Sequence, residues 1–243
     1  MITSGSTILI TGGSSGIGLA MAKRFLELKN KVIITGRNEE RLQRIMAEFP
    51  EMEIFAGDLA DNQCLLALVN FIQQRHPGIN ILINNAAVQY NYELAGEPDI
   101  TGKTDYEISA NLAAPIKLTG LLLPLLQKNP NSAVVNVSSG LFIAPKASAP
   151  VYCATKAGMH SFSKSLRYQL VSCGIKVFEI IPSLIDTPMT AGRGKGKISP
   201  GRLVDEFLRD FRADRFESYI GKAKLLKIIH RIWPRAADRI MKN

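Results

Sequence analysis

The residues with the clearest chemical potential lie between positions 139 and 156. Ser139 follows an apolar run typical of a buried strand, and Tyr152 and Lys156 lie four residues apart in a helical pattern. A free phenol, with a pKa near about 10, is a poor acid or base at neutral pH. A lysine ammonium beside it favours the phenolate, so we expect Lys156 to lower the pKa of Tyr152. The spacing therefore predicts acid–base catalysis at Tyr152.

The helix that carries this pair is predicted to begin just before Tyr152. Ser148 is a residue type that caps helices, and Pro150 suits a first helical turn. A Tyr-x-x-x-Lys spacing also occurs on ordinary exposed helix faces, where the lysine stem covers apolar surface. The chemical interpretation therefore depends on what the rest of the chain places around the pair.

A glycine-rich turn near the N-terminus is a candidate site for a pyrophosphate. Residues 7–11 have the pattern of a buried strand, and a helical pattern follows the turn. A helix N-terminus after such a turn presents free amides and the positive end of its dipole to a phosphate. A tight connection without a ligand is the alternative. The residues expected to contact the cofactor here are Gly12, Ser14, Ser15, Gly16, Ile17 and Gly18.

The end of the second predicted strand, residues 31–36, bears on the choice between NAD and NADP. Folds specific for NAD place an Asp or Glu there, on the ribose 2′-hydroxyl. This chain has Gly36 followed by Arg37, so no carboxylate repels a 2′-phosphate and a guanidinium can bind it. We therefore expect NADP(H) to be preferred over NAD(H). A solvated loop charge is the alternative for Arg37.

Strands and helices alternate along the whole chain. Besides those named above, strands are predicted at 52–56, 80–83, 133–137, 176–181 and 217–220, and helices at 39–49, 61–75, 106–122 and 202–213, with a surface loop at 88–103. The alternation predicts an α/β fold: one doubly wound Rossmann-type domain over residues 1–243, with a parallel sheet of about seven strands and helices on both faces. The candidate residues fall at strand C-terminal ends, where such folds bind ligands.

Together these motifs resemble the short-chain dehydrogenase/reductase family, over residues 5–190. The matching segments are T-G-G-S-S-G-I-G at 11–18, N-N-A-A at 84–87, Y-C-A-T-K at 152–156 and P-S-L-I-D-T at 182–187, with Asn111 and Ser139. Residues 140–173 look most like the DltE-type oxidoreductases of that family. Two positions depart from its pattern, since Ala87 and Ser183 stand where glycine is usual. Ser183 borders the expected nicotinamide pocket.

The resemblance implies a catalytic tetrad and a set of cofactor contacts. Tyr152 would exchange a proton with the substrate oxygen and Ser139 would hydrogen-bond that oxygen. Lys156 would hold the nicotinamide ribose and lower the Tyr152 pKa, and Asn111 would anchor a relay water in a helix kink. Tyr152 and Lys156 count among the cofactor contacts too. The others implied are Arg37 with the 2′-phosphate, Asp58 with adenine, the backbone near Asn85 with ribose, Ile185 and Thr187 with the carboxamide, and also Leu59, Ala86 and Pro182.

These features predict an NADP-dependent oxidoreductase that moves a hydride between nicotinamide and a carbonyl or secondary alcohol. The alternative is a non-catalytic NADP-binding sensor or regulator, either free or associated with a membrane. It would need the glycine turn but not the serine, tyrosine and lysine together. The substrate would be a small molecule held by residues 140–150, 88–96 and a loop region at 190–215. A homodimer or homotetramer is expected.

The composition indicates a cytoplasmic protein. Its 46% hydrophobic and 21% charged residues are ordinary for a globular domain. No apolar run approaches the roughly 18 residues of a membrane span, and the chain enters a strand too early for a signal peptide. Three cysteines, Cys64, Cys153 and Cys173, fit a reducing compartment and have no metal-ligand spacing. No metal site is expected.

The positive charge is concentrated at the C-terminal end. Residues 192–243 carry 14 Lys+Arg against 6 Asp+Glu, which accounts for most of the net charge of +9. In residues 220–243 basic side chains gather on one helical face and apolar ones, including Trp233, on the other; Pro234 should divide the segment in two. The segment either packs on the core or a second subunit, or lies on an anionic membrane or over a lipid-like substrate. No set of base-stacking aromatics accompanies it, so no nucleic-acid partner is expected.

Overall fold

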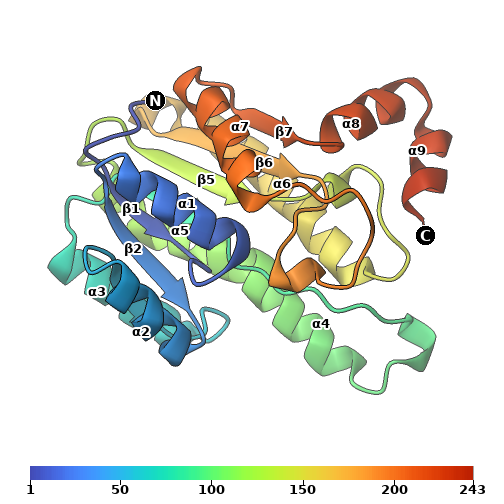
Figure 1. Cartoon of the computed structure of the whole chain (residues 1–243), viewed down its shortest axis with the longest axis horizontal. Coiled ribbons are helices and arrows are strands. Elements are labelled where there is room, and N and C mark those ends of the chain that lie inside the picture. Colours follow the sequence, from blue (N-terminus) through green and yellow to red (C-terminus); the bar gives the residue numbers. More distant parts are fainter. Residues whose placement is uncertain (243) are drawn as a thin grey trace.

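Seven strands form one parallel sheet in the computed structural model, which describes residues 1–242; Asn243, the end of the predicted basic segment, lies outside them. The strand order is β3-β2-β1-β4-β5-β6-β7, and every neighbouring pair is parallel. This confirms the predicted doubly wound sheet. Figure 1 labels β1, β2, β5, β6 and β7. The strands are β1 (Thr7–Ile10), β2 (Lys31–Gly36), β3 (Glu53–Ala56), β4 (Ile81–Asn84), β5 (Ala133–Val137), β6 (Lys176–Pro182) and β7 (Glu217–Ile220).

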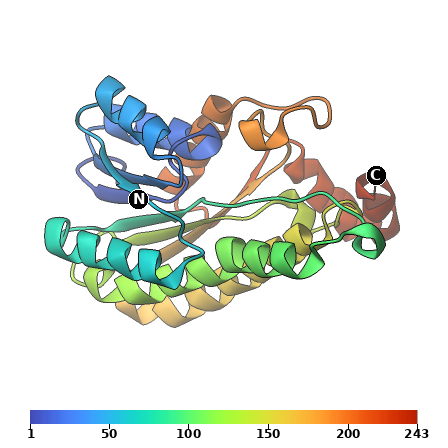
Figure 2. The same ribbon diagram turned by 90° about the horizontal axis from the view of Figure 1, so that it is seen from below.

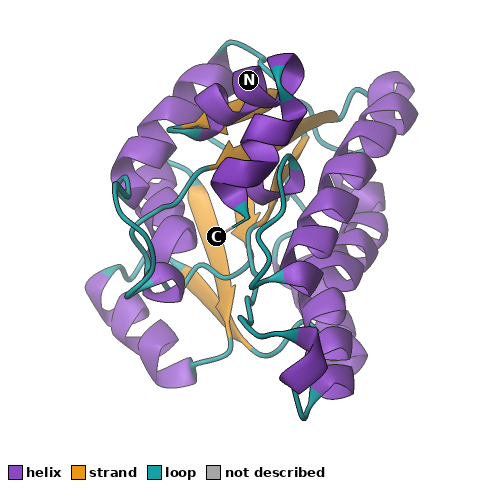
Figure 3. Ribbon diagram, turned by 90° about the vertical axis from the view of Figure 1, so that its right-hand side faces the viewer, coloured by secondary structure: helices purple, strands orange, loops and turns teal. Residues whose placement is uncertain are grey.

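Helices cover both faces of the sheet (Figures 2 and 3). One face is packed by α1, α2 and α7, and the other by α3, α5 and α6. The bounds are α1 (Gly16–Glu27), α2 (Glu39–Glu48), α3 (Asn62–Arg75), α4 (Ile100–Ile108), α5 (Ala114–Leu126), α6 (Pro150–Leu170), α7 (Pro200–Arg212), α8 (Ala223–Ile232) and α9 (Pro234–Met241).

The central strands are apolar on both faces because both faces are covered. In β1, Ile8 and Ile10 belong to the core under α1 and α7, while Leu9 belongs to the core under α3 and α5. All three side chains are fully buried, and each such burial stabilises the fold by roughly 1.5–3 kcal/mol. The alternation within one continuous apolar run is what a parallel sheet requires.

Two local predictions are wrong. Helix α4 begins at Ile100, inside the segment expected to be a surface loop, and a short 3₁₀ turn precedes it at Leu94–Gly96. Ser148 does not cap α6: Ala149 occupies the N-cap position, and the Ser148 carbonyl instead accepts a hydrogen bond from the Tyr92 backbone. The long loop at 88–99 therefore packs beside the N-terminus of α6.

Helix α4 continues through one π-helical turn, Ser109–Ala113, into α5. Contrary to the expectation from apolar runs, the continuous helix Ile100–Leu126 is long and apolar enough to cross a membrane by length and composition. In the structure Leu118, Leu122 and Leu126 are buried in the core beneath β4 and β5. An apolar helix that covers a sheet passes the same test.

The C-terminal segment forms two helices beyond β7, at one end of the molecule (Figure 1). Helix α8 ends at Ile232 and α9 begins at Pro234, so the predicted division at Pro234 is confirmed. Leu226 and Ala237 are buried against Ala144 in a small separate cluster. The segment therefore packs on the loop that follows β5.

Candidate active site

A cleft of about 440 Å³ opens at the C-terminal ends of the central strands. It brings together residues that are far apart in the sequence, from the glycine turn to α6 and the loop after β6. Four predicted site residues do not line it: Gly18, Asn111, Ser139 and Ile185. The predicted site residues that do are Gly12, Ser14, Ser15, Gly16, Ile17, Arg37, Asp58, Leu59, Asn85, Ala86, Tyr152, Lys156, Pro182 and Thr187.

The glycine turn is shaped to receive a phosphate. Gly12 has a φ of +65°, and a Cβ there would lie 2.8 Å from the Ala86 Cα, so only glycine fits without strain. Ser15 is the N-cap of α1, but its side chain makes no capping hydrogen bond, and the first turn has no acidic residue. The first amides of α1 are thus available to an anion beside a cleft of suitable size. These residues fit the diphosphate of a nicotinamide dinucleotide.

Gly18, which does not line the cleft, and Asn85, which does, both support the glycine turn. A side chain on Gly18 would collide with the Gly12 carbonyl. The Asn85 amide donates to the Thr11 and Gly12 carbonyl oxygens at 2.9 and 3.1 Å. The Asn85 backbone N–H donates to the Thr11 hydroxyl at 3.0 Å. The side chain of Asn85 therefore fixes the path of the turn.

Arg37 and Asp58 are joined at the other end of the cleft by a residue that the sequence analysis did not select. Arg37 donates to the Tyr106 hydroxyl at 2.6 Å, and that hydroxyl donates to Asp58 Oδ2. Burial and the Asp58 hydrogen bond raise the pKa of Tyr106. Arg41, on the first turn of α2, also lines the cleft. Two guanidinium groups thus lie where β2 ends.

Tyr152 and Lys156 lie on the first turns of α6 and are both buried, at 8% and 3% exposure. Lys156 Nζ lies 5.5 Å from the centre of the Tyr152 ring and donates to the Val137 carbonyl at 2.9 Å. Ser139 caps the 3₁₀ turn Gly140–Phe142 through its Oγ, which accepts from the Leu141 N–H at 3.2 Å. The Ser139 hydroxyl also lies within hydrogen-bonding reach of Tyr152, so the end of β5 and the start of α6 bring the three side chains together.

Asn111 lies in the π-helical turn between α4 and α5 and is buried. Its side chain accepts from the Val88 N–H and donates to the Val88 carbonyl, both at 2.8 Å, and donates to Thr155 Oγ1 at 3.3 Å. A π-helical turn frees backbone groups from the regular helix ladder. The Asn111 side chain therefore fixes the loop after β4 against α6.

The comparisons with known proteins agree with this geometry. A family model described as short chain dehydrogenase matches residues 6–197. The chain belongs to the short-chain dehydrogenase family. The oxidoreductase DltE of Bacillus subtilis (strain 168) is 43% identical to it over 182 residues, which is 75% of this chain and 72% of the relative. The chain is therefore an NAD(P)-dependent oxidoreductase that acts on alcohol or carbonyl groups.

Solved structures share the fold of this short-chain dehydrogenase. A short chain dehydrogenase from Burkholderia cenocepacia J2315, solved in complex with NADP, superposes with a TM-score of 0.89 over 100% of both chains, at 22% identity. One from Sphingobium yanoikuyae, solved in complex with NADPH, gives 0.83 over 96% of both chains, at 25% identity. These likenesses extend the common fold to the C-terminal residues.

The pKa of Tyr152 moves in the direction opposite to the one expected. Burial raises it above its ordinary value, and the opposing effects come from the Ser139 hydroxyl and the charge of Arg193. Burial also lowers the pKa of Lys156, to about 8. The lowered pKa of Lys156 weakens its ability to stabilise a Tyr152 phenolate above neutral pH. In the protein alone, desolvation outweighs the Tyr–Lys pair.

Two further charged residues of this short-chain dehydrogenase influence the pKa of Tyr152: Glu107 raises it and Arg193 lowers it. The carboxyl of Glu107 is fully buried; Oε1 accepts from the Tyr90 N–H at 3.2 Å, and Oε2 has no hydrogen-bond partner within residues 1–242. Burial raises its pKa. Arg193, after β6, has a buried Nη1 that is also without a partner in that range. In the sequence they read as an ordinary helix position and a loop charge, so no local signal identifies them.

Ile185 is placed differently from the other predicted contacts. Its side chain is 3% exposed and belongs to the core beneath α7, and its carbonyl accepts from the Thr190 hydroxyl. Thr187 lies two residues on and lines the cleft. Any contact of Ile185 with a nicotinamide ring would therefore come from its main chain.

Proposed function

We propose that this chain is an NADP-dependent reductase or dehydrogenase of one domain, in which Tyr152 exchanges a proton with the oxygen of a carbonyl or secondary alcohol. One observation carries the proposal. A single cleft joins a glycine turn fit for phosphates to the buried Tyr152 and Lys156. When bound, the nicotinamide supplies or accepts the hydride, and the protein provides orientation and the proton.

The roles proposed for the side chains follow from their positions. Tyr152 carries its proton at neutral pH and would give it to the carbonyl oxygen, although burial raises its pKa and makes it a weaker acid in the protein without cofactor. Ser139 lies beside it at the end of β5 and would hold the substrate oxygen. Lys156, anchored on the Val137 carbonyl, would bind ribose hydroxyls. Asn111 would keep a relay water in the π-helical turn.

Preference for NADP(H) is supported by the charges at the end of β2. Arg37 and Arg41 both line the cleft there, and the position after β2 that carries Asp or Glu in NAD-specific folds is Gly36-Arg37. A 2′-phosphate would compete with Tyr106 for the Arg37 guanidinium and would bind it more strongly, because it carries a charge. Asp58 would then be free to contact adenine.

The test is consumption of NADPH and of NADH with a panel of aldehydes and ketones, followed by absorbance. We expect turnover with some members of the panel and a lower KM for NADPH. Cofactor binding, measured separately by fluorescence, distinguishes the alternative of a non-catalytic sensor. Tight NADPH binding without turnover of any carbonyl or alcohol would favour the sensor and contradict the enzyme.

A homodimer or homotetramer is supported by apolar side chains on the helices that cover one face of the sheet. Tyr168 and Val171, at the end of α6, are 71% and 75% exposed. Ile108, Ile116 and Leu121, on the long helix of α4 and α5, are 37–41% exposed. Light scattering of the purified chain would give the mass of the assembly; a monomer at micromolar concentration would contradict this proposal.

A peripheral contact with an anionic membrane is the second proposal, and the outer face of α8 and α9 supports it. Leu225, Ile228, Ile232, Trp233 and Ile240 are 55–78% exposed, whereas only Ala223, Leu226 and Ala237 of these helices are buried. Packing on the core therefore uses only part of the apolar surface. Residues 220–242 carry seven Lys+Arg and one Asp, a charge that favours an acidic leaflet by about 1 kcal/mol per residue.

Co-sedimentation with vesicles tests the membrane contact. We expect binding to vesicles that contain an acidic phospholipid, less binding at high salt, and loss of binding in an Ile232→Ser, Trp233→Ser double variant. Leu66→Ser, at an apolar position of α3 that is 51% exposed, is the matched control. Failure to bind any vesicle would leave the enzyme proposal intact and contradict this one.

The three free cysteines are consistent with a cytoplasmic enzyme. Its docking surface would then be the cytoplasmic face of a membrane.

A further inference from the structure

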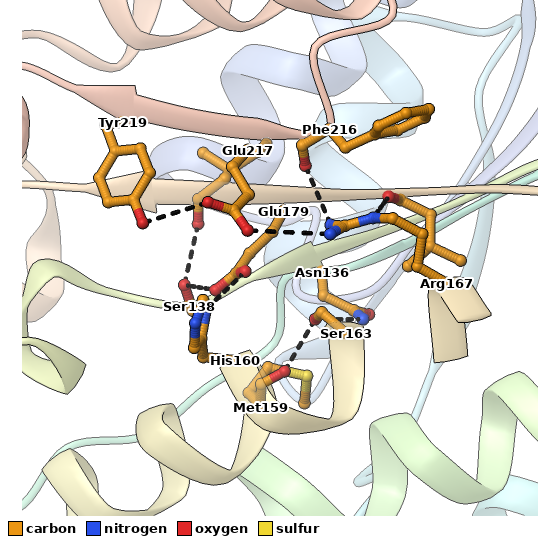
Figure 4. A network of polar contacts seen from close by, with 12 residues as sticks. Asn136, Ser138, Met159, His160, Ser163, Arg167, Glu179, Phe216, Glu217 and Tyr219 are labelled. Atoms are coloured by element: carbon orange, nitrogen blue, oxygen red, sulfur yellow. Dashed lines mark hydrogen bonds and ion pairs between the residues drawn. The ribbon is translucent and has the colours of Figure 1, made fainter. Parts of the chain in front are cut away.

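A buried carboxylate lies directly behind the catalytic residues and takes no part in the tetrad. Glu179, on β6, has no solvent exposure. Its Oε1 accepts a hydrogen bond of 2.5 Å from the Ser138 hydroxyl, and its Oε2 lies 2.8 Å from His160 Nδ1 (Figure 4). Burying a carboxylate costs several kcal/mol unless it is paired and hydrogen-bonded. Both oxygens of Glu179 meet that condition, so the position of each partner is fixed.

The two partners of Glu179, Ser138 and His160, contact the two ends of the segment from Ser139 to Phe142. Ser138 immediately precedes Ser139, and its backbone N–H also donates to the Ile180 carbonyl at 2.9 Å. The His160 ring stacks on Phe142, with ring centres 4.0 Å apart and planes 10° from parallel. Phe142 ends the 3₁₀ turn that Ser139 caps. One carboxylate therefore determines both the end of β5 and the orientation of the first aromatic residue beyond it.

We propose that Glu179 and His160 are positioning residues of the active site. Glu179 holds Ser139 in place through Ser138, and His160 holds the Phe142 ring three residues after Ser139, where it would form an apolar wall for bulky or aromatic carbonyl substrates. The inference rests on the proposed oxidoreductase function and deepens it, because it assigns a cause to the shape of the pocket. His160 lies one helical turn after Lys156, so the same pair also borders the lysine of the tetrad.

The charge of Glu179 acts on Lys156 as well. Burial lowers the pKa of that lysine, and Glu179 and Glu107 oppose the effect. Other ionisable groups face Glu179 too: His160 from α6, and Glu217 and Tyr219 from β7, where Arg167 and Lys227 pair with Glu217. Glu179 is the carboxylate with the largest effect on Lys156 among them. Its neutralisation should therefore let Lys156 lose its proton at a lower pH.

The chain supplies a matched control. Glu217 is the direct neighbour of Glu179 in the β6–β7 register. It pairs with Arg167 at 3.7 Å (Figure 4) and with Lys227 at 3.8 Å. Neither partner belongs to the tetrad. E179Q and E217Q thus remove the same charge from adjacent strands. Gln at 179 retains hydrogen-bonding atoms for Ser138 and for neutral His160, which limits any loss of folding.

The first measurement is the titration of Lys156 by NMR of the lysine ε-carbon, with its resonance identified by comparison with Lys156→Met. This readout needs neither cofactor nor turnover, so it separates the present inference from the proposed function. We expect the Lys156 titration to move to lower pH in E179Q and to stay in place in E217Q. Equal titrations in E179Q, E217Q and the parent would overturn the electrostatic part of the proposal.

The second measurement is the dependence of KM and kcat on substrate size in H160Q, which can still donate to Glu179 but cannot stack on Phe142. A misplaced wall should raise KM for aryl ketones by as much as about a hundredfold, with a smaller change for acetaldehyde and none in NADPH affinity. Phe142→Leu should reproduce the pattern. An equal change for large and small substrates would overturn the wall. If the parent reduces no carbonyl, the proposed function fails, and the NMR titration still decides the role of Glu179.

Discussion

The cofactor cleft and the C-terminal helices α8 and α9 present different kinds of surface. At the glycine turn, contacts come from main-chain amides and from positions where a side chain would not fit, such as Gly12 and Gly18. The outer surface of α8 and α9 instead consists mainly of basic side chains and exposed apolar ones, such as Ile232 and Trp233. A site made of main-chain amides binds one kind of ligand because the backbone sets its geometry. A surface made of side chains can change its ligand with few substitutions.

The difference also separates recognition of the cofactor from recognition of the substrate or of a surface. A cradle of amides at a helix N-terminus recognises a diphosphate whatever the reaction. The roles proposed for Phe142, in substrate size, and for the outer face of α8, in membrane contact, depend instead on side chains. Variants on the two sides should therefore have separable effects, with cofactor affinity changing on one side and substrate preference or surface binding on the other.

The largest effect is expected for Tyr152→Phe. Removing the hydroxyl removes the proposed proton donor, so turnover should fall by about 10²–10⁴-fold, while the ring still fills its buried position. NADPH affinity should stay close to that of the parent. Tyr168→Phe, on the exposed side of the same helix, is the control and should leave turnover unchanged. Near-parental turnover in Tyr152→Phe would mean that another group supplies the proton.

Arg37→Gln should have the next largest effect, and only on one cofactor. Loss of a charged hydrogen bond to the 2′-phosphate should weaken NADPH binding by about 1.5–3 kcal/mol, or roughly tenfold to a hundredfold, and leave NADH binding unchanged. Arg44→Gln, on the exposed face of α2 and paired only with Glu40 at 3.5 Å, is the control. Equal affinities of the parent for NADPH and NADH would contradict the proposed preference. A Gly36→Asp variant is a poorer test, because its Cβ would press on Ser14 Oγ.

Gly12→Ala should weaken both cofactors together. A positive φ costs a residue with a Cβ roughly 1–2 kcal/mol, and the new methyl group would also press on Ala86. We expect the affinities for NADPH and NADH to fall by about tenfold each, measured by fluorescence titration. Gly174→Ala, at a glycine with a similar φ of +69° but with no atom within 4 Å of the added Cβ, is the matched control. A change in substrate preference without a change in cofactor affinity would show that the turn serves another role.

The smallest effect on folding is expected for Ile232→Ser. This side chain is 78% exposed, so the free energy of unfolding should change by less than about 0.5 kcal/mol. Leu226→Ala, on the inner face of the same helix, should cost about 2 kcal/mol because it leaves a cavity beside Ala144. Thermal or denaturant unfolding of the two variants compares the faces directly. Equal destabilisation would mean that the outer face is also covered in solution.

The parts of the site that could be predicted are those encoded by short spacings. Strand, turn and helix N-terminus at 7–18, and the four-residue separation of Tyr152 and Lys156, are local patterns with a fixed geometry. The position of each strand in the sequence could also be predicted from its apolar run. Such features survive in the structure because tertiary packing reinforces the local preference.

The remaining features depend on contacts between distant segments. Tyr106 reaches Asp58 across 48 residues of chain and Arg37 across 69, and Glu179 reaches Ser138 across 41. None of these pairings has a local signature. The pKa of Tyr152 was predicted in the wrong direction because the spacing reveals its neighbour Lys156 but not the burial of both groups. The start of α4 at Ile100 and the cap of α6 likewise depend on how the loop at 88–99 packs.

The central claim is that this protein transfers a hydride from NADPH to a carbonyl carbon. Incubation with NADPH deuterated at the transferable C4 position, followed by mass spectrometry and NMR of the alcohol formed from an active carbonyl, tests it most directly. We predict deuterium on the carbinol carbon in the parent, in one stereochemical configuration, and far slower formation of the same product with Tyr152→Phe. An alcohol without deuterium on that carbon, or no alcohol from any carbonyl that the parent binds with NADPH, would contradict it.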